Sequence, residues 1–187
     1  MIDWLTLSAG ALPYTSFLDR YATPAQRARW DAMHAQFALT SEQRNLLSSF
    51  ARHMSVLCLA GAWCGDCINQ CPVFAHFARA SALIDLRFLD RDADPTLRES
   101  LAINGGQRVP VVIFLSEDWF EVARYGDRTL SIYRRMAADQ LGPACPTGFV
   151  APSGLALSTL ASEWLAEFER VQLMLRLSPR LRAVHAD

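Results

Sequence analysis

Two cysteines separated by two residues are the part of this sequence that most directly suggests chemistry. Cys64 and Cys67 enclose Gly65 and Asp66, and an apolar run over 54–60 precedes them. A C-x-x-C pair alone is a weak signal, but a pair between a strand and a helix is typical of thiol–disulfide exchange. A structural or metal-binding pair is the alternative.

This chemistry needs a strand, a turn and a helix in succession, and the sequence predicts all three. The apolar run over 54–60 predicts a buried strand, and 64–80 predicts a helix kinked by Pro72, which removes one backbone hydrogen bond. At the start of that helix, Cys64 would face unpaired backbone N–H groups and the positive end of the helix dipole, which favour a thiolate. Cys67, one turn further, would be within reach of a mixed disulfide. We expect Cys64 to be the more exposed sulfur.

The rest of the pattern predicts a mixed α/β sheet with helices on both faces. Residues 1–22 give mixed signals and are expected to form a loop or short turns. Thr23-Pro24 and the capping-box sequence at 40–43 mark two helix starts. Further strands are expected over 84–89, 109–115 and 120–125, and helices over 94–103, 129–141 and 155–177. We divide the chain into an N-terminal helical extension (1–50), a core (51–141), and a linker loop with a C-terminal helix packing on the core (142–187).

Composition limits the function classes. The 187 residues are 51% apolar and 20% charged, which is typical of a globular domain. A net charge of −1 gives no electrostatic footprint for nucleic acid, and no apolar run has the length of a membrane span. The first residues lack the basic region of a signal peptide, so we expect a cytoplasmic protein. The five cysteines are odd in number and four of them cluster, unlike a secreted disulfide framework.

The segment 63–67, Trp-Cys-Gly-Asp-Cys, resembles the Trp-Cys-Gly-Pro-Cys motif of the thioredoxin family, with Asp66 in place of proline. Pro72 matches the family's helix-kinking proline, and Val109-Pro110 matches the cis-proline that faces the disulfide. Gly126 lies where the family has a glycine beside its peptide-binding groove. The resemblance covers roughly residues 50–140, and the aspartate variant is similar to a less studied bacterial branch.

This resemblance implies a thioredoxin-like three-layer α/β/α sandwich. Cys64 would attack a substrate disulfide, Cys67 would resolve the mixed disulfide, and Pro110 would shape the groove. No cofactor is implied, because the two sulfurs hold the electrons. The implied partners are disulfide-containing proteins, with a reductase or low-molecular-weight thiol as electron donor. We expect no nucleic-acid or membrane partner. We expect the protein to be a monomer or a homodimer. The residues expected to line the site are Trp63, Gly65, Asp66, Val109, Pro110 and Gly126.

Asp66 departs from the family motif. A carboxylate in the first helical turn suits the helix dipole, so it could serve only the helix start. Its negative charge also lies near both sulfurs, where it disfavours a thiolate. Asp66 could therefore shift the redox potential, or accept a proton from Cys67.

The other cysteines leave alternatives open. Cys58 occupies the position of the family's buried aspartate, which relays a proton, and is expected to pack in the core. Cys71 lies one turn after Cys67 on the same helix face. It could pack, act as a third redox thiol, or join Cys64 and Cys67 as ligands of a soft metal. Cys145 is assigned no role.

Thiol–disulfide oxidoreductase is the leading prediction. A thioredoxin-like adaptor without turnover is one alternative, favoured slightly by the long apolar-striped helix at 155–177. Soft-metal binding through Cys64, Cys67 and Cys71 is the other.

Overall fold

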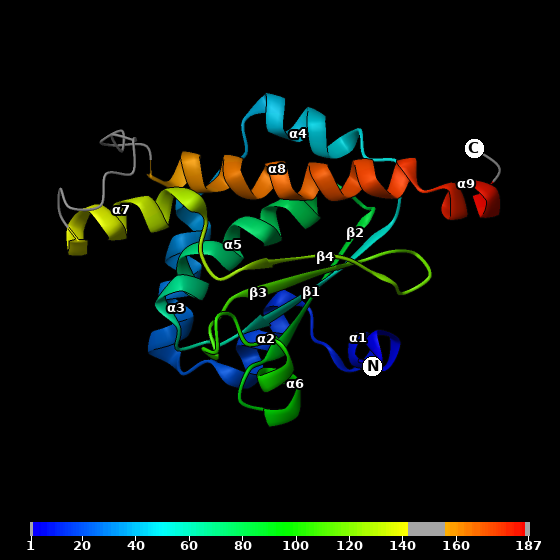
Figure 1. Cartoon of the computed structure of the whole chain (residues 1–187). Helices are drawn as coiled ribbons and strands as arrows, with labels where there is room; N and C mark the ends of the chain where they lie inside the picture. The colour runs from blue at the N-terminus through cyan, green and yellow to red at the C-terminus, as the bar shows by residue number, and fades with distance from the viewer. Residues whose placement is uncertain (1, 142–155, 186–187) are drawn as a thin grey trace.

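The computed structural model describes residues 2–141 and 156–185, and it contains a four-stranded sheet flanked by helices (Figure 1). The strands are β1 (Met54–Ala60), β2 (Ile84–Asp90), β3 (Val111–Leu115) and β4 (Glu121–Gly126). The helices before β2 are α1 (Trp4–Gly10), α2 (Tyr14–Tyr21), α3 (Pro24–Gln36), α4 (Ser41–Ser48) and α5 (Gly65–Ala80). The later helices are α6 (Pro95–Ser100), α7 (Leu130–Leu141), α8 (Ala156–Leu177) and α9 (Pro179–His185).

The sheet has the strand order β2-β1-β3-β4. β1 pairs in parallel with β2, and β3 pairs antiparallel with both β1 and β4. Every residue of β1 and β3 is buried, whereas β4 is partly exposed along its length. The two inner strands are apolar except for the buried Ser55 of β1, because both of their faces are covered.

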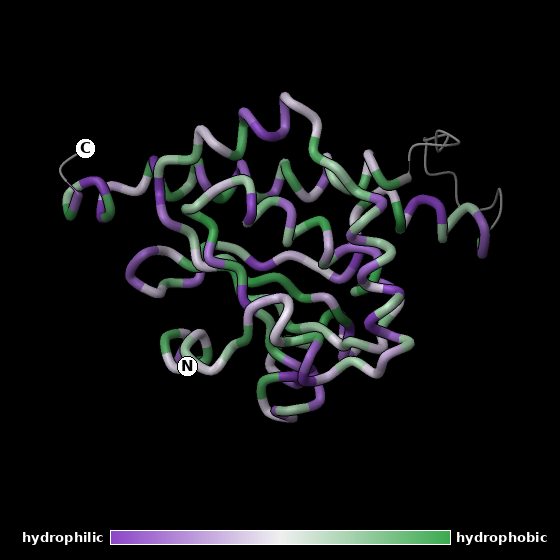
Figure 2. Tube along the Cα trace, turned by 180° about the vertical axis from the view of Figure 1, so that it is seen from behind, coloured by the Kyte–Doolittle hydropathy of each residue, from purple (hydrophilic) through white to green (hydrophobic). Residues whose placement is uncertain are grey.

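Helices cover both faces of the sheet, as the sequence predicts. α5 and α8 lie together over one face, where α5 packs on β2 and α8 on β4 (Figure 1). α6 lies on the opposite side, and α2 packs against β2. The most hydrophobic segments run through the middle of the molecule along the strands (Figure 2).

The apolar stripe of α8 belongs to this core. Its buried residues are Leu160, Ala161, Trp164, Leu165, Phe168, Val171 and Leu175. The Trp164 ring packs edge-on to Phe74 with 4.4 Å between ring centroids, and Phe168 packs in the same way on Phe114 at 5.0 Å. Each such ring pair adds about 0.5–1.5 kcal/mol beyond the burial of its area. The stripe that slightly favoured an adaptor therefore faces the sheet and not a partner.

The prediction of a loop or short turns over residues 1–22 is wrong, because this segment forms α1 and α2. Asp3 caps α1 by accepting from the Thr6 backbone N–H at 3.1 Å. In α2, Phe17 is fully buried and Leu18 is 1% exposed. Helices this short are marginal alone and are stabilised by packing, so local sequence signals for them are weak. α9 is also absent from the prediction.

The predicted helix starts are confirmed. The Thr23 and Thr40 hydroxyls each accept a hydrogen bond from the backbone N–H three residues on. The side-chain oxygens of Gln26 and Gln43 accept from the backbone N–H groups of Thr23 and Thr40, which completes two capping boxes. Helix ends are less accurate, since α6 stops at Ser100, whereas the sequence predicts a helix over 94–103. The linker predicted over 142–154 lies outside the described residues.

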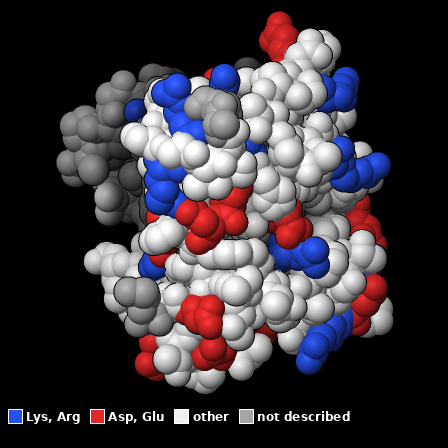
Figure 3. Space-filling view, turned by 90° about the vertical axis from the view of Figure 1, so that its right-hand side faces the viewer, with Lys and Arg blue, Asp and Glu red and all other residues white. Residues whose placement is uncertain are grey.

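Charges of both signs are interspersed on the face of the molecule that Figure 3 shows. All 18 basic side chains counted in the chain are arginines, because the sequence contains no lysine. Within the described ranges, no helix has the length and apolar character that crossing a membrane requires.

A buried glutamine ties α8 to the chain that leads into β1. The Gln172 side-chain oxygen accepts from the backbone N–H groups of Ala51 (3.1 Å) and Arg52 (2.7 Å). Its amide nitrogen donates to the Arg52 carbonyl at 2.9 Å. Gln172 is 3% exposed, so one buried side chain satisfies three backbone groups, two of which belong to the buried Arg52.

We expect Gln172→Ala to lower the free energy of unfolding by roughly 1–3 kcal/mol, because it leaves buried backbone groups unsatisfied. Urea denaturation followed by circular dichroism measures this change. Arg176→Ala, at an exposed position on the same helix, is the control and should change the value by less than about 0.5 kcal/mol. Equal losses in the two variants would contradict this role for Gln172.

Candidate active site

Cys64 and Cys67 lie at the start of α5, directly after β1. Cys64 caps the helix with an extended backbone, and its N–H donates to the Gly61 carbonyl at 3.0 Å. The Cys64 carbonyl in turn accepts from the Ile68 N–H at 3.0 Å. Cys64 is 9% exposed and Cys67 is fully buried. The turn therefore presents one sulfur outward and keeps the other behind it, as the sequence predicts.

Trp63 covers the turn from outside. A Cβ on Gly61 would lie 2.8 Å from the Trp63 ring, so the indole packs directly on the glycine backbone. The ring is partly exposed, with a residue exposure of 45%, and the Arg91 guanidinium lies 4.4 Å from its centroid. A cation over an indole face is attracted by about 0.5–1 kcal/mol at an exposed site. The turn is also held from inside, because the buried Trp30 indole donates to the Ala62 carbonyl at 2.8 Å.

The Val109-Pro110 peptide bond is cis and lies beside the cysteines. The Cys64 Sγ is 3.6 Å from the Val109 carbonyl oxygen, so its thiol can donate to that group. Gly126 packs against the next peptide group, between Pro110 and Val111, where a Cβ would clash with the Pro110 carbonyl oxygen. Its φ of +154° also falls where side chains are rarely tolerated. These predicted site residues thus meet at one point.

Gly65 is exposed at the first position of α5. A Cβ there would meet no atom within 4 Å, so the space in front of this residue is open.

The two thiols affect each other's ionisation. The interaction with Cys67, and then burial, raise the pKa of Cys64, while the backbone N–H groups of Asp66 and Cys67 act in the opposite direction. Burial opposes ionisation of Cys67, but contacts with the thiols of Cys64 and Cys71 and with the Gly61 backbone outweigh it and lower the pKa of Cys67 to about 5. Strongly interacting groups titrate as a pair. The pair therefore loses its first proton readily and its second with difficulty.

Asp66 forms an ion pair that the sequence does not reveal. Its carboxylate lies 2.6 Å from Arg128, and both side chains are largely shielded from solvent. The charge of Asp66 acts to raise the pKa of Cys67, in the direction expected for a neighbouring carboxylate. Arg128 carries the opposite charge against this carboxylate, so we expect it to counter the effect of Asp66 on the thiols.

A second carboxylate, that of Asp127, interacts with Arg128 and with two residues near it. Asp127 is 2% exposed and lies 3.1 Å from Arg128 and 3.5 Å from Arg108. The Tyr133 hydroxyl donates to the same carboxylate. Asp127, Arg108 and Arg128 border a cavity of about 270 Å³ together with Cys64. It is lined by Trp63, Cys64, Asp66, Arg91, Gln107, Arg108, Val109, Asp127 and Arg128.

We call the residues that line this cavity the rim of the site. Gln70, which sequence analysis did not single out, supports the rim from within the core. It is fully buried on α5, and its amide nitrogen donates to the Asp127 carbonyl at 2.9 Å. Its oxygen accepts from the Trp164 indole at 2.8 Å. A glutamine on the apolar side of a predicted helix is the signal that could have found it.

The remaining described cysteines lie behind the pair. Cys58 and Cys71 are fully buried, with 3.8 Å between their Sγ atoms. All four described cysteines are unbridged. Among the residues that the structure describes, no group of three His, Cys, Asp or Glu side chains is placed to hold a metal ion, which does not support metal binding by Cys64, Cys67 and Cys71. Cys145 lies outside the described residues.

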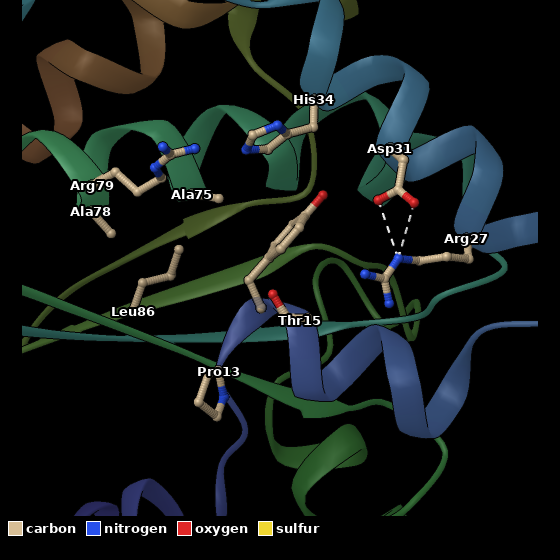
Figure 4. Close-up of a pocket in the computed structure, with 10 residues that line it drawn as sticks. Pro13, Thr15, Arg27, Asp31, His34, Ala75, Ala78, Arg79 and Leu86 are labelled. Carbon is tan, nitrogen blue, oxygen red and sulfur yellow. Dashed lines mark hydrogen bonds and ion pairs between the residues drawn. The ribbon is translucent and has the colours of Figure 1, made fainter.

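A separate cavity of about 460 Å³ lies between the N-terminal helices and α5 (Figure 4). The Arg27–Asp31 ion pair, His34 and Arg79 border it, and no cysteine lines it. The Tyr14 hydroxyl is buried there without a hydrogen-bond partner among the described residues. Burial, and to a lesser extent a charge on the nearby Cys71, raise the pKa of Tyr14.

Comparisons with known proteins bear on the family and the fold of this chain. A family model described as thioredoxin matches residues 11–140, and so begins inside the predicted N-terminal extension. A crystal structure of a protein of unknown function from Pseudomonas aeruginosa superposes with a TM-score of 0.69 at 18% identity, covering 91% of this chain and 99% of that one. An HIV epitope-scaffold gives the same TM-score and identity over 90% of this chain and 99% of its own. No curated protein matches the sequence.

At 18% identity the two structures establish only the fold of this chain. The family itself is established by the family model, which matches the amino-acid sequence. The match covers the cysteine turn, Pro110 and Gly126, and takes in well over half of the chain. The chain belongs to the thioredoxin family.

Proposed function

We propose that this protein is a thiol–disulfide oxidoreductase that works through the Cys64/Cys67 pair. One observation carries the proposal: a sulfur that borders a solvent-facing cavity lies directly in front of a second, fully buried sulfur. This order suits exchange chemistry, in which one thiol meets the substrate and the other acts afterwards.

In the first step, Cys64 attacks one sulfur of a substrate disulfide as a thiolate. A bond forms between Cys64 Sγ and that sulfur, the substrate's own S–S bond breaks, and the other substrate sulfur leaves as a thiolate that takes up a proton. The easy first ionisation of the pair supplies the negative charge at neutral pH. The open space in front of Gly65 leaves room for the approach.

In the second step, Cys67 attacks Cys64 Sγ. The Cys64–Cys67 disulfide forms, the mixed disulfide breaks, and the second substrate thiol leaves. The substrate is reduced by two electrons and the protein is oxidised by two. A reductase or a low-molecular-weight thiol returns the pair to the dithiol. We take disulfide-containing proteins as the substrate class.

The rim residues would guide the partner. The exposed Trp63 face offers a flat apolar contact beside the sulfur. The Val109 backbone next to Pro110 lies against Cys64 and could hold an extended segment across it. Polar contacts at the rim would come from the arginines, which already pair with Asp66 and Asp127.

We expect Cys67→Ser to accumulate mixed disulfides between Cys64 and its substrates, because the resolving sulfur is absent. Non-reducing gels and mass spectrometry of affinity-purified protein measure these adducts. Cys64→Ser is the matched control and should trap none. An adaptor without turnover would give no specific adduct in either variant, and that result would sink the proposal.

We expect the alkylation rate of Cys64 by iodoacetamide to stay nearly constant between about pH 6 and 8 and to fall below about pH 5. The pair already carries one negative charge at pH 7, since the pKa of Cys67 is lowered to about 5. A free thiol such as reduced glutathione, with a pKa near 8.5, should instead react roughly tenfold faster per pH unit over the same range. A Cys64 profile that rises in parallel with glutathione would contradict the shared ionisation.

We expect Asp66→Asn and Arg128→Ala to move the thiol titration in opposite directions. Removing the Asp66 charge lowers the pKa of Cys67, and removing Arg128 raises it by leaving Asp66 unopposed. The thiolate absorbance near 240 nm, followed against pH, measures both shifts. Arg29→Ala, which removes an exposed arginine from α3, controls for the loss of one positive charge. Shifts in the same direction would show that Asp66 and Arg128 do not act as a pair.

A further inference from the structure

Two buried thiols remain that the exchange cycle above does not use. Cys58 lies in the middle of β1, opposite Phe88 of β2 and Val112 of β3. Cys71 lies on α5, and its Sγ is 3.8 Å from that of Cys58. Neither residue has measurable exposure.

These thiols continue a line of sulfurs that starts at the surface. Cys64 borders the cavity, Cys67 lies behind it and Cys71 follows one helical turn later on the same face. The thiols of Cys67 and Cys71 are within interaction range, as are those of Cys64 and Cys67. Cys58 ends the line in the core.

We propose that Cys58 and Cys71 form a second, internal dithiol that is oxidised through Cys67, so that the reduced chain holds four reducing equivalents instead of two. The proposal rests on the proposed function, because the Cys64–Cys67 disulfide is its oxidant.

The transfer needs two exchange steps. In the first, Cys71 attacks Cys67 Sγ of the Cys64–Cys67 disulfide, a Cys67–Cys71 bond forms, and Cys64 leaves and takes up the proton that Cys71 gives up. In the second, Cys58 attacks Cys71 Sγ, a Cys58–Cys71 bond forms, and Cys67 leaves with the proton from Cys58. Two electrons and two protons move outward, and the surface pair is a dithiol again. A second substrate disulfide can then be reduced.

The geometry requires small movements. The Cys58 and Cys71 sulfurs are in van der Waals contact at 3.8 Å, and a disulfide bond brings sulfurs to about 2.05 Å. The Cys67-to-Cys71 step is the harder one, since Cβ atoms four residues apart on a helix are separated by about 5–6 Å, against about 3.5–4.5 Å in a disulfide. Pro72 follows Cys71 directly and has no N–H to donate to the Ile68 carbonyl, so this turn of α5 has one restraining hydrogen bond fewer.

Burial gives the inner pair its specificity. Reagents in solution reach Cys64, whereas Cys58 and Cys71 have no exposed surface of their own. Oxidation of the inner pair, Cys58 and Cys71, therefore depends on an intact surface pair, Cys64 and Cys67. Two core cysteines that only fill space would stay reduced under every condition in which the protein is folded.

The experiment uses an aromatic disulfide reagent, 5,5′-dithiobis(2-nitrobenzoate). It counts the aromatic thiolates that the reduced chain releases from this reagent. The background is Cys145→Ser, which removes the cysteine outside the described residues. We expect four equivalents of reagent thiolate per chain, one for each described cysteine, and two in Cys71→Ala, which has no thiol at position 71 to attack the Cys64–Cys67 disulfide. Differential alkylation with peptide mass spectrometry should find a Cys58–Cys71 bridge in the fully oxidised protein.

The double variant Cys64→Ser/Cys67→Ser is the matched control. It keeps the inner pair and should leave Cys58 and Cys71 reduced. A Cys58–Cys71 bridge in this variant would overturn the route through Cys67. Cys58 and Cys71 that remain alkylatable after the Cys64–Cys67 bridge has formed would overturn the inner pair while leaving the proposed function intact.

Failure of the Cys64–Cys67 bridge itself would instead overturn the proposed function, so the two failures are distinguishable. Bridge mapping on the otherwise unaltered chain decides the question even where a core alanine variant does not fold.

Discussion

The turn between β1 and α5 has to hold one sulfur at the surface and another in the core, and much of the surrounding packing depends on it. Buried hydrogen bonds fix the turn from several directions. Trp30 donates to the Ala62 carbonyl, and Gln70 connects Trp164 to the Asp127 carbonyl. Each buried polar group would cost about 1–3 kcal/mol if its partner were lost. The N-terminal and C-terminal helices thus support the site through a few directional contacts as well as through apolar area.

Local sequence signals predict the central part of the molecule well. The strand before Cys64, the helix after it and the two capping boxes are encoded within a few residues of where they act. The helices α1 and α2 are different, because Phe17 and Leu18 stabilise α2 through residues far along the chain, and a seven- or eight-residue helix has little stability alone. The resemblance to thioredoxins brought Pro110 and Gly126 to the cysteines, which spacing alone could not have done.

The ion pairs at the rim of the site could not be predicted from the sequence, because they also join residues that are far apart along the chain. Asp66 and Arg128 are 62 positions apart, and nothing near either residue indicates the other. Asp66 alone predicts a negative charge beside the sulfurs. With Arg128 against it, and Asp127 shared between Arg128 and Arg108, the site carries alternating charges. Its electrostatic character comes from this arrangement and not from the motif.

The absence of lysine has a consequence for this rim. A guanidinium keeps its proton far above the range in which thiols ionise. Arg91, Arg108 and Arg128 therefore present constant positive charge to a visiting molecule from mildly acidic to strongly alkaline solution. A change of pH therefore acts on the site through its two thiols, while the positive charges beside them stay in place.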